Sequence, residues 1–159
     1  MQPLMYQLYS CSMLRILKTA CKVLGIDPDT VNADVFFVRS DEIRELNRRT
    51  RNTDKPTDVL SFPMLEVTKP TIPTPELYPL DINPDTNKLE LGDIVICKEY
   101  AELGINYLCV HGFLHLLGWV HETDADNAKM TEMTEFILET SLKNQKQKGY
   151  GKQSGVRNE

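Results

Sequence analysis

The three histidines of the chain lie in one short stretch, at a spacing that can bind a metal ion. They are His111, His115 and His121. Because an α-helix advances about 100° per residue, a separation of four places His111 and His115 about 40° apart on one helical face. Two imidazoles on adjacent turns can bind a single ion. A histidine on an apolar helix is more often a packed core residue, so the pair alone does not decide between the two readings.

The third histidine and a glycine favour the metal site. His121 lies six residues beyond His115 and would point away if the helix continued. Gly118 lies between them, and glycine accepts the left-handed conformation that ends helices. The chain can then turn back and bring the third imidazole to the other two. Three imidazoles leave a fourth metal position open for water.

The residue after the first histidine separates this pattern from that of a protease. Zincin proteases of the same spacing carry a glutamate there, which acts as general base. This chain has Gly112, which argues against peptide hydrolysis. Water would then be activated by the metal alone, or with a base from elsewhere. Glu122 is one candidate base, although an exposed residue at the start of a helix is the simpler interpretation.

A basic segment contains a second candidate for chemistry. Arg44, Arg48 and Arg49 follow a helical pattern, and such a charge run is usually a solvated helix face. Arg51 is predicted to lie beyond that helix, before a turn that leads into the next strand. A guanidinium group binds phosphate through two parallel hydrogen bonds. If Arg51 lies near the metal, the pair suits a phosphodiester, because the ion activates water and the arginine stabilises developing charge.

The hydrophobic pattern predicts the elements that must position these residues. Gly25 ends the first helix, and Pro63 closes the second strand. A capping box of Thr123 and Asp126 begins the last helix, whose inner stripe is Met130, Met133 and Ile137. The predicted helices cover residues 12–24, from Ser40 onward, 105–117 and from Thr123 onward, and the predicted strands cover 34–38, 57–62 and 92–96.

Two segments are predicted to lack regular structure. Six of the nine prolines lie between Pro63 and Pro84, which predicts a mobile loop over about residues 63–90. From residue 143 to 159 apolar residues almost vanish and basic ones accumulate, which predicts a disordered tail. The sequence therefore predicts one domain over residues 1–142, followed by this tail.

Length and composition predict an ordinary globular chain. The 159 residues suit one domain, with 41% hydrophobic and 26% charged residues. The net charge of −5 argues against wholesale coating of nucleic acid. Four scattered cysteines without a C-x-x-C pair suggest a reducing compartment. With no predicted signal peptide or membrane span, the expected location is the cytoplasm.

Four blocks of sequence support a resemblance. They are residues 41–51, residues 54–63 (DKPTDVLSFP), residues 91–96 (LGDIVI) and the histidine run from His111 to His121. In this order they resemble the YbeY family of bacterial endoribonucleases, over most of residues 12–140. The histidine motif together with the KPTDVLSFP block is highly specific for that family.

The resemblance implies a fold, a cofactor and partners. The fold is a single α/β (α+β) domain with a mixed, mainly four-stranded sheet and packed helices. The implied cofactor is Zn²⁺ held by His111, His115 and His121, and the family's conserved arginine corresponds to Arg51. The implied activity is single-strand-specific cleavage of ribosomal RNA, in its maturation and in ribosome quality control. The implied partners are the ribosome and ribosomal proteins, with neither DNA nor a membrane among them.

Two other functions remain open at this stage. One is a ribosome-assembly or RNA-binding factor with a structural zinc, which would need a fourth protein ligand. Cys109 is predicted to lie on the opposite side of the helix, and Cys97 is distant in sequence. The other is a metal-dependent hydrolase of another substrate, including peptides. Nickel, copper and iron also accept nitrogen ligands.

Overall fold

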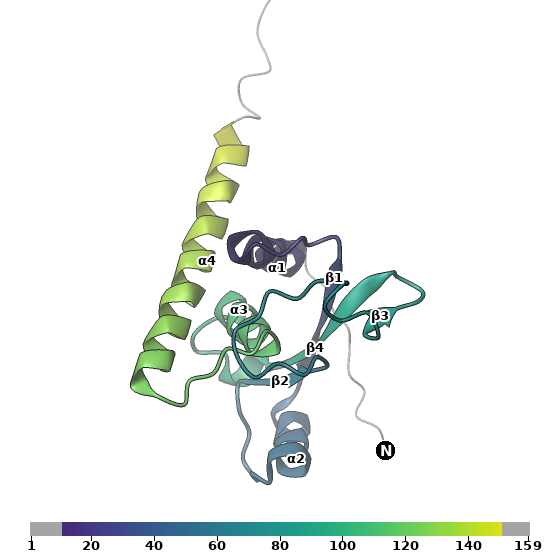
Figure 1. Ribbon diagram of the computed structural model, residues 1–159. Helices are drawn as coiled ribbons and strands as arrows, with labels where there is room; N and C mark the ends of the chain where they lie inside the picture. The colour runs from purple at the N-terminus through teal and green to yellow at the C-terminus, as the bar shows by residue number, and fades with distance from the viewer. Residues whose placement is uncertain (1–10, 151–159) are drawn as a thin grey trace, which may run out of the picture.

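The computed structural model describes residues 11–150, and residues 1–10 and 151–159 lie outside that range. Helices and strands alternate in the first half of the chain, and three consecutive strands and then three consecutive helices follow (Figure 1). In order they are α1 (Cys11–Leu24), β1 (Val31–Val38), α2 (Ser40–Arg51), β2 (Val59–Pro63), β3 (Ile82–Asn83), β4 (Lys88–Cys97), the short 3₁₀ helix η1 (Lys98–Tyr100), α3 (Ile105–Leu116) and α4 (Asp124–Tyr150).

Strand β4 is the centre of a mixed sheet. It pairs in parallel with β1 and antiparallel with β2, and the short strand β3 also pairs with it antiparallel. A strand places successive side chains on opposite faces. Ile94 and Ile96 therefore join the main core with α1, α3 and α4, whereas Val95 and Cys97 join a smaller core under α2. The predicted α+β fold with a four-stranded mixed sheet is confirmed.

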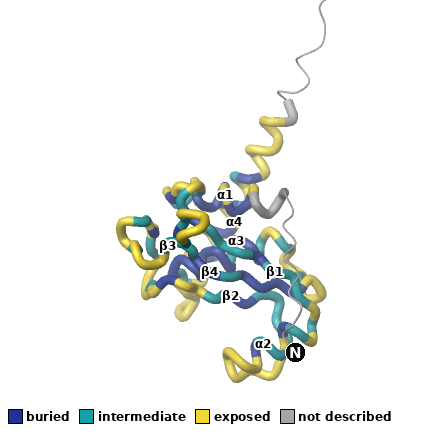
Figure 2. The backbone as a smooth tube through the Cα atoms, turned by 90° about the vertical axis from the view of Figure 1, so that its right-hand side faces the viewer, coloured by how far each residue is buried: buried dark blue, intermediate teal, exposed yellow. Residues whose placement is uncertain are grey.

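Helix α3 is surrounded by other elements and is apolar on nearly all sides. It contacts β2, β4, α1 and α4, and the burial of its residues contrasts with the exposed end of α4 (Figure 2). Leu108, Val110 and Leu114 are fully or almost fully buried. A helix that is buried all round needs apolar residues on every face. The polar exceptions on α3 are therefore informative, and His111 and His115 are two of them.

Several boundaries differ from the sequence predictions, among them the start of β1 at Val31 rather than at residue 34. Arg51 is the last residue of α2 rather than a residue beyond it, and Asn52 ends the helix in the left-handed conformation, with φ of 52°. β4 begins at Lys88, before the predicted start at Gly92, and β3 forms a hairpin with it inside the predicted loop. The residues between Pro84 and Asn87 supply the turn, which polar turn formers favour.

The prediction of a disordered tail from residue 143 onward is wrong for its first part. Helix α4 continues to Tyr150, eight residues past the predicted boundary. Residues 143–148 are lysine, asparagine and glutamine, and apart from asparagine they have good helix propensity. Extending an existing helix avoids the cost of nucleation. The remaining residues of the predicted tail, 151–159, lie outside the described range.

Candidate metal centre

The three histidines lie together around one point. Their ligand nitrogens all lie within 4.8 Å of one another. The ring centroids of His111 and His115 are 4.7 Å apart, and His121 lies 5.6 Å from the first and 4.9 Å from the second. His111 and His115 occupy adjacent turns of α3, and His121 follows the helix. The three could therefore hold one metal ion, at the end of a helix as predicted.

A left-handed turn at Gly118 returns the chain to the site. Gly118 has φ of +86°, a conformation that L side chains rarely adopt. Its N–H donates to the carbonyl of His115 at 3.1 Å, and the N–H of Trp119 donates to the carbonyl of Leu114 at 3.1 Å. These bonds satisfy carbonyls that the end of the helix leaves free. The predicted glycine-assisted reversal is present.

The proline-rich segment holds this turn from outside. A Cβ at Gly118 would collide with the carbonyl oxygen of Lys69 and lie 3.2 Å from the Cβ of Val67. The N–H of Thr71 donates to the carbonyl of Leu117 at 2.9 Å. This part of the predicted mobile loop is therefore packed against the end of α3.

One hydrogen bond fixes how His115 presents its nitrogens. Its Nδ1 lies 2.9 Å from the carbonyl oxygen of Trp119. A carbonyl can only accept, so Nδ1 carries the proton and the neutral ring directs the lone pair of Nε2 elsewhere. That Nε2 lies 3.1 Å from Nε2 of His111. Two nitrogens of a tetrahedral zinc site lie about 3.3 Å apart, given Zn–N bonds of about 2.0–2.1 Å. The pair therefore fits the distance that one zinc ion requires.

Burial keeps the two helical imidazoles neutral. It lowers the pKa of His111 to about 4, assisted by the nearby His115 and His121, while Asp58 acts in the opposite direction. Burial likewise lowers the pKa of His115, against the effect of its bond to Trp119. Metal binding requires the unprotonated imidazole. Both rings are therefore in the metal-binding form at neutral pH.

The Nδ1 atoms of His111 and His115 differ in their hydrogen bonding. Ligating histidines usually donate their other N–H to a carbonyl or a carboxylate. Nδ1 of His111 is buried and has no hydrogen-bond partner among the described residues. The ring lies instead beside Tyr107, with stacked planes and centroids 6.0 Å apart. The ring of His111 is thus held by packing, and that of His115 by a hydrogen bond.

Packing explains the glycine where a protease carries its glutamate. A Cβ at Gly112 would lie 2.7 Å from Cγ2 of Ile94 and 3.1 Å from Oγ of Ser61. Both neighbours are buried, one on β4 and one on β2. Position 112 therefore faces the sheet, and any side chain there would press against Ile94. The close packing of α3 on the sheet thus favours glycine over a glutamate at this position.

Arg51 and the three histidines line the same cavity. The cavity has a volume of about 510 Å³, and residues of β2 and of the turn after α3 form much of its wall. The guanidinium group of Arg51 donates from Nη2 to the carbonyl of Ser61 at 2.9 Å. Its positive charge also contributes to lowering the pKa of His115. Arg51 therefore lies where it can act with the histidines on one bound group.

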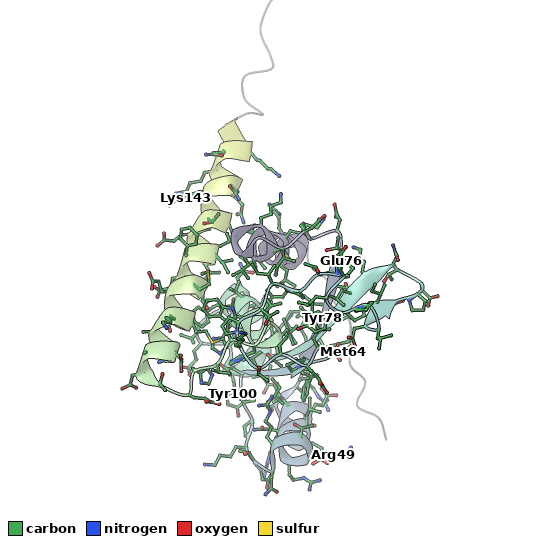
Figure 3. The ribbon with its side chains drawn as sticks, in the orientation of Figure 1. Arg49, Met64, Glu76, Tyr78, Tyr100 and Lys143 are labelled. Atoms are coloured by element: carbon green, nitrogen blue, oxygen red, sulfur yellow. The ribbon has the colours of Figure 1, made fainter. Side chains whose placement is uncertain are left out.

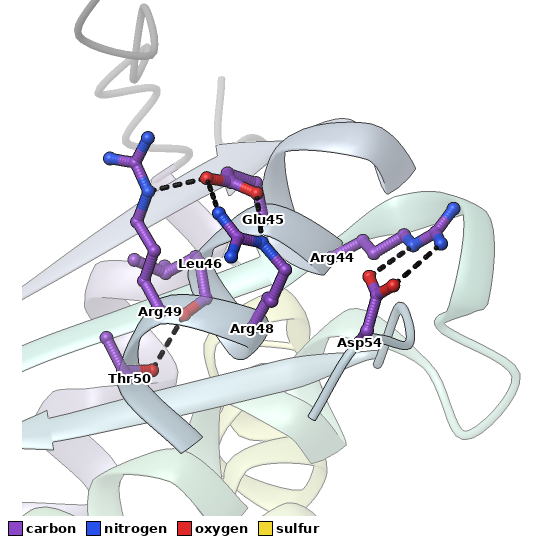
Figure 4. Close-up of polar contacts among 7 residues, drawn as sticks. All are labelled: Arg44, Glu45, Leu46, Arg48, Arg49, Thr50 and Asp54. Atoms are coloured by element: carbon purple, nitrogen blue, oxygen red, sulfur yellow. Dashed lines mark hydrogen bonds and ion pairs between the residues drawn. The ribbon is translucent and has the colours of Figure 1, made fainter. Parts of the chain in front are cut away.

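The other arginines of α2 are engaged elsewhere. Arg44 makes two hydrogen bonds to Asp54, and both Arg48 and Arg49 pair with Glu45 (Figure 4). All three side chains are largely exposed. The predicted solvated face is confirmed for them, and the predicted difference between them and Arg51 is present in the structure.

Asp58 is a cavity residue that the sequence predictions did not include. It is the only carboxylate among the described residues that line the cavity. Its Oδ1 accepts a bond from the N–H of Val59 at 2.8 Å and one from the hydroxyl of Thr57 at 3.2 Å. The candidate base Glu122 is exposed and does not line the cavity. Asp58 was missed because only the pairing of β2 with β4 brings it beside α3.

The described residues offer no fourth protein ligand. Cys97 and Cys109 are both fully buried in the cores, and neither joins the group of possible ligands. Since structural zinc sites usually have four protein ligands, the three-histidine group is better suited to a site with an open position.

Within residues 11–150, no helix combines the length and the apolar character needed to cross a bilayer.

Sequence comparisons extend over most of the chain. The family model described as Endoribonuclease YbeY matches residues 5–141. A protein of that name from Clostridium botulinum strain Eklund 17B is 36% identical over 139 residues, covering 78% of this chain and 82% of the relative. One from Thermoanaerobacter sp. strain X514 is 38% identical over 136 residues, with the same coverage. The solution structure of TM1509 from Thermotoga maritima is 24% identical, with a TM-score of 0.49 over 92% of this chain and 89% of that one.

Proposed function

Because the chain belongs to the YbeY endoribonuclease family, we propose that it is a zinc-dependent endoribonuclease that cleaves single-stranded regions of ribosomal RNA. The observation that carries this proposal is the cavity that three imidazoles and one arginine line together. In this proposal the enzyme acts in the cytoplasm, in maturation and quality control of ribosomal RNA, together with the ribosome and its proteins.

Each residue has a distinct role in the proposed reaction. His111, His115 and His121 would hold the zinc ion, which would act as a Lewis acid and lower the pKa of water. Arg51 binds the phosphodiester and stabilises the negative charge that develops on it. Asp58 provides an acceptor for a proton at the cavity wall. A cavity of about 510 Å³ has the size of a small-molecule site, which suits an unpaired nucleotide better than a duplex.

The test compares two substitutions in the purified protein. His115→Ala should lose both bound zinc and cleavage of single-stranded RNA, because a ligand is missing. Arg51→Ala should retain zinc but lose at least about 100-fold in kcat, the loss typical of a removed transition-state donor. Arg49→Ala is the matched control, since Arg49 lies on the exposed face of α2 and pairs with Glu45. Metal content is measured by mass spectrometry. Cleavage is measured with labelled RNA as the substrate.

Two results would contradict the proposal. Cleavage by a metal-free His115→Ala protein at the wild-type rate would exclude the metal mechanism. A wild-type protein with bound zinc that binds RNA without cleaving it would favour the RNA-binding factor instead.

A further inference from the structure

A second groove lies between α1 and the C-terminal part of α4. The two helices pack against each other (Figure 1), and the groove between them has a volume of about 370 Å³. A helix rises 1.5 Å per residue, so the groove residues of α4 lie about 25–35 Å along the helix from its start at Asp124. That start follows His121 by three residues. The groove is therefore remote from the metal centre.

The two helices present matching polar stripes to this groove. On α1 the lining residues are Arg15, Lys18, Thr19 and Lys22, and on α4 they include Ser141, Asn144, Gln145 and Lys148. Both sets follow the spacing i, i+3, i+4, i+7 of a single helical face. Thr19 and Ser141 are small and buried, and the longer side chains are exposed. The small residues thus form a floor, with cations and amides above it.

The groove is positively charged although the chain has a net charge of −5. No acidic side chain lines it, and the sequence contains no acidic residue before Asp27. Among the ion pairs of the described residues, none involves Arg15, Lys18, Lys22 or Lys148. In contrast, Lys143 projects from the side of α4 that faces away from α1 (Figure 3) and pairs with Glu139.

We propose that this groove binds the sugar–phosphate backbone of single-stranded RNA whose cleaved segment lies in the metal cavity. The inference rests on the proposed function and extends it, because it makes the preferred substrate a strand long enough to reach both sites. Lysine and arginine side chains bind phosphates, and amides such as those of Asn144 and Gln145 bind ribose hydroxyls. These contacts carry no base specificity, so they position a strand rather than select its sequence.

The lining favours RNA over a lipid surface. Helices that bind membranes insert apolar side chains between the lipids, in addition to their basic residues. Every side chain that lines this groove is polar. The groove can therefore bind the phosphates of a polynucleotide, but it has no apolar side chains to bury in a bilayer.

The test removes three charges from the groove and three from elsewhere. The groove variant is Lys18→Gln with Lys22→Gln and Lys148→Gln. The control variant is Lys129→Gln with Lys143→Gln and Lys146→Gln, which removes the same charge from exposed positions of α4 that do not line the groove. Both are compared with the wild type in the zinc-bound full-length chain. Fluorescence anisotropy measures binding to single-stranded RNA of about 40 nucleotides at several salt concentrations, and cleavage is measured on that RNA and on one of about 4 nucleotides.

The groove variant should bind the long RNA at least about tenfold more weakly than the control variant. Its slope of log affinity against log salt should fall by about two, since each phosphate contact on a single strand contributes about 0.7. Cleavage of the short RNA should be the same in both variants, because a strand of about 4 nucleotides in the cavity is too short to reach the groove as well. Unfolding temperature and zinc content serve as checks that both variants are intact.

Equal binding of the long RNA by the two variants would overturn the groove proposal while leaving cleavage, and thus the proposed function, unaffected. A groove-dependent loss of binding in a wild-type protein that cleaves no RNA would uphold the groove and reject the proposed function. Vesicles containing phosphatidylserine form a third arm. If the groove variant loses vesicle binding but keeps RNA binding, the site recognises lipid phosphate and the RNA proposal is wrong.

Discussion

Gly112→Ala tests whether α3 lies against the sheet as closely as the structure indicates. Two effects oppose each other. Alanine gains about 1 kcal/mol over glycine in a helix interior. Overpacking a well-filled core costs about 1–3 kcal/mol. The new Cβ would lie 2.7 Å from Cγ2 of Ile94, whereas carbon atoms pack best at about 3.5–4.0 Å.

The neighbour cannot easily move away. Ile94 is 0% exposed and belongs to β4, which pairs with β1 on one side and β2 on the other. The cost should therefore fall in the upper part of the overpacking range. We expect a net loss of about 1–2 kcal/mol in the free energy of unfolding. For a chain of this size that corresponds to a fall of about 2–8 °C in Tm.

A double-mutant cycle separates the collision from other effects. Ile94→Ala removes the methyl group in question and should by itself cost about 2–5 kcal/mol. In the double variant the new Cβ occupies part of the vacated space, so the two costs should sum to at least about 1 kcal/mol more than the observed loss. Urea unfolding with a chelator present measures all four proteins without a contribution from metal binding. A Gly112→Ala protein as stable as the wild type, with additive costs in the cycle, would refute the close packing.

Three further predictions concern the same region and the cores. Gly118→Ala should destabilise the protein by about 1–3 kcal/mol, because φ is positive there and the Lys69 carbonyl blocks a Cβ; unchanged unfolding in urea would contradict this. Zinc at a thousandfold excess over its Kd should stabilise the fold by about 4 kcal/mol, an effect lost in His121→Ala; a Tm indifferent to chelator in the wild type would exclude a zinc site. Burial raises the pKa of Cys109 to about 12 and of Cys21 to about 11, above the ordinary 9.0. The folded state therefore holds these protons more tightly than the unfolded state, so the free energy of unfolding should fall as pH rises above about 9. Iodoacetamide at pH 8 should label neither thiol before unfolding, as peptide mapping would show.

Local signals predicted much of the fold and of the site. The histidine spacing and Gly118 predicted the cluster because helix geometry and the turn depend on neighbouring residues only. The cap of α4 was also predicted correctly, since the N–H of Asp126 donates to the hydroxyl of Thr123 at 3.1 Å. Met130 and Ile137 are buried on the inner side of that helix, as expected.

The features that were missed depend on contacts between distant residues. Asp58 enters the cavity only because β2 pairs with β4. The early start of β4 places Glu90 next to Asn32 of β1, where the two side chains form a hydrogen bond of 2.9 Å. The polar–apolar alternation from Lys88 to Leu91 is itself a strand pattern, but the prolines of the preceding segment outweighed it in the sequence prediction. The charged groove was missed because it needs α1 and α4, at opposite ends of the chain, to lie side by side.

The packing of the Lys69 carbonyl on Gly118 divides the long connection between β2 and β3 into two parts with different uses for protein engineering. Near Lys69 and Thr71 the chain length is fixed, because an added or deleted residue would shift the backbone that braces the third imidazole. Farther along, Leu80 is 96% exposed. A peptide tag or a fluorophore inserted beside Leu80 would thus leave the metal centre undisturbed, whereas the same insertion ten residues earlier would dismantle it.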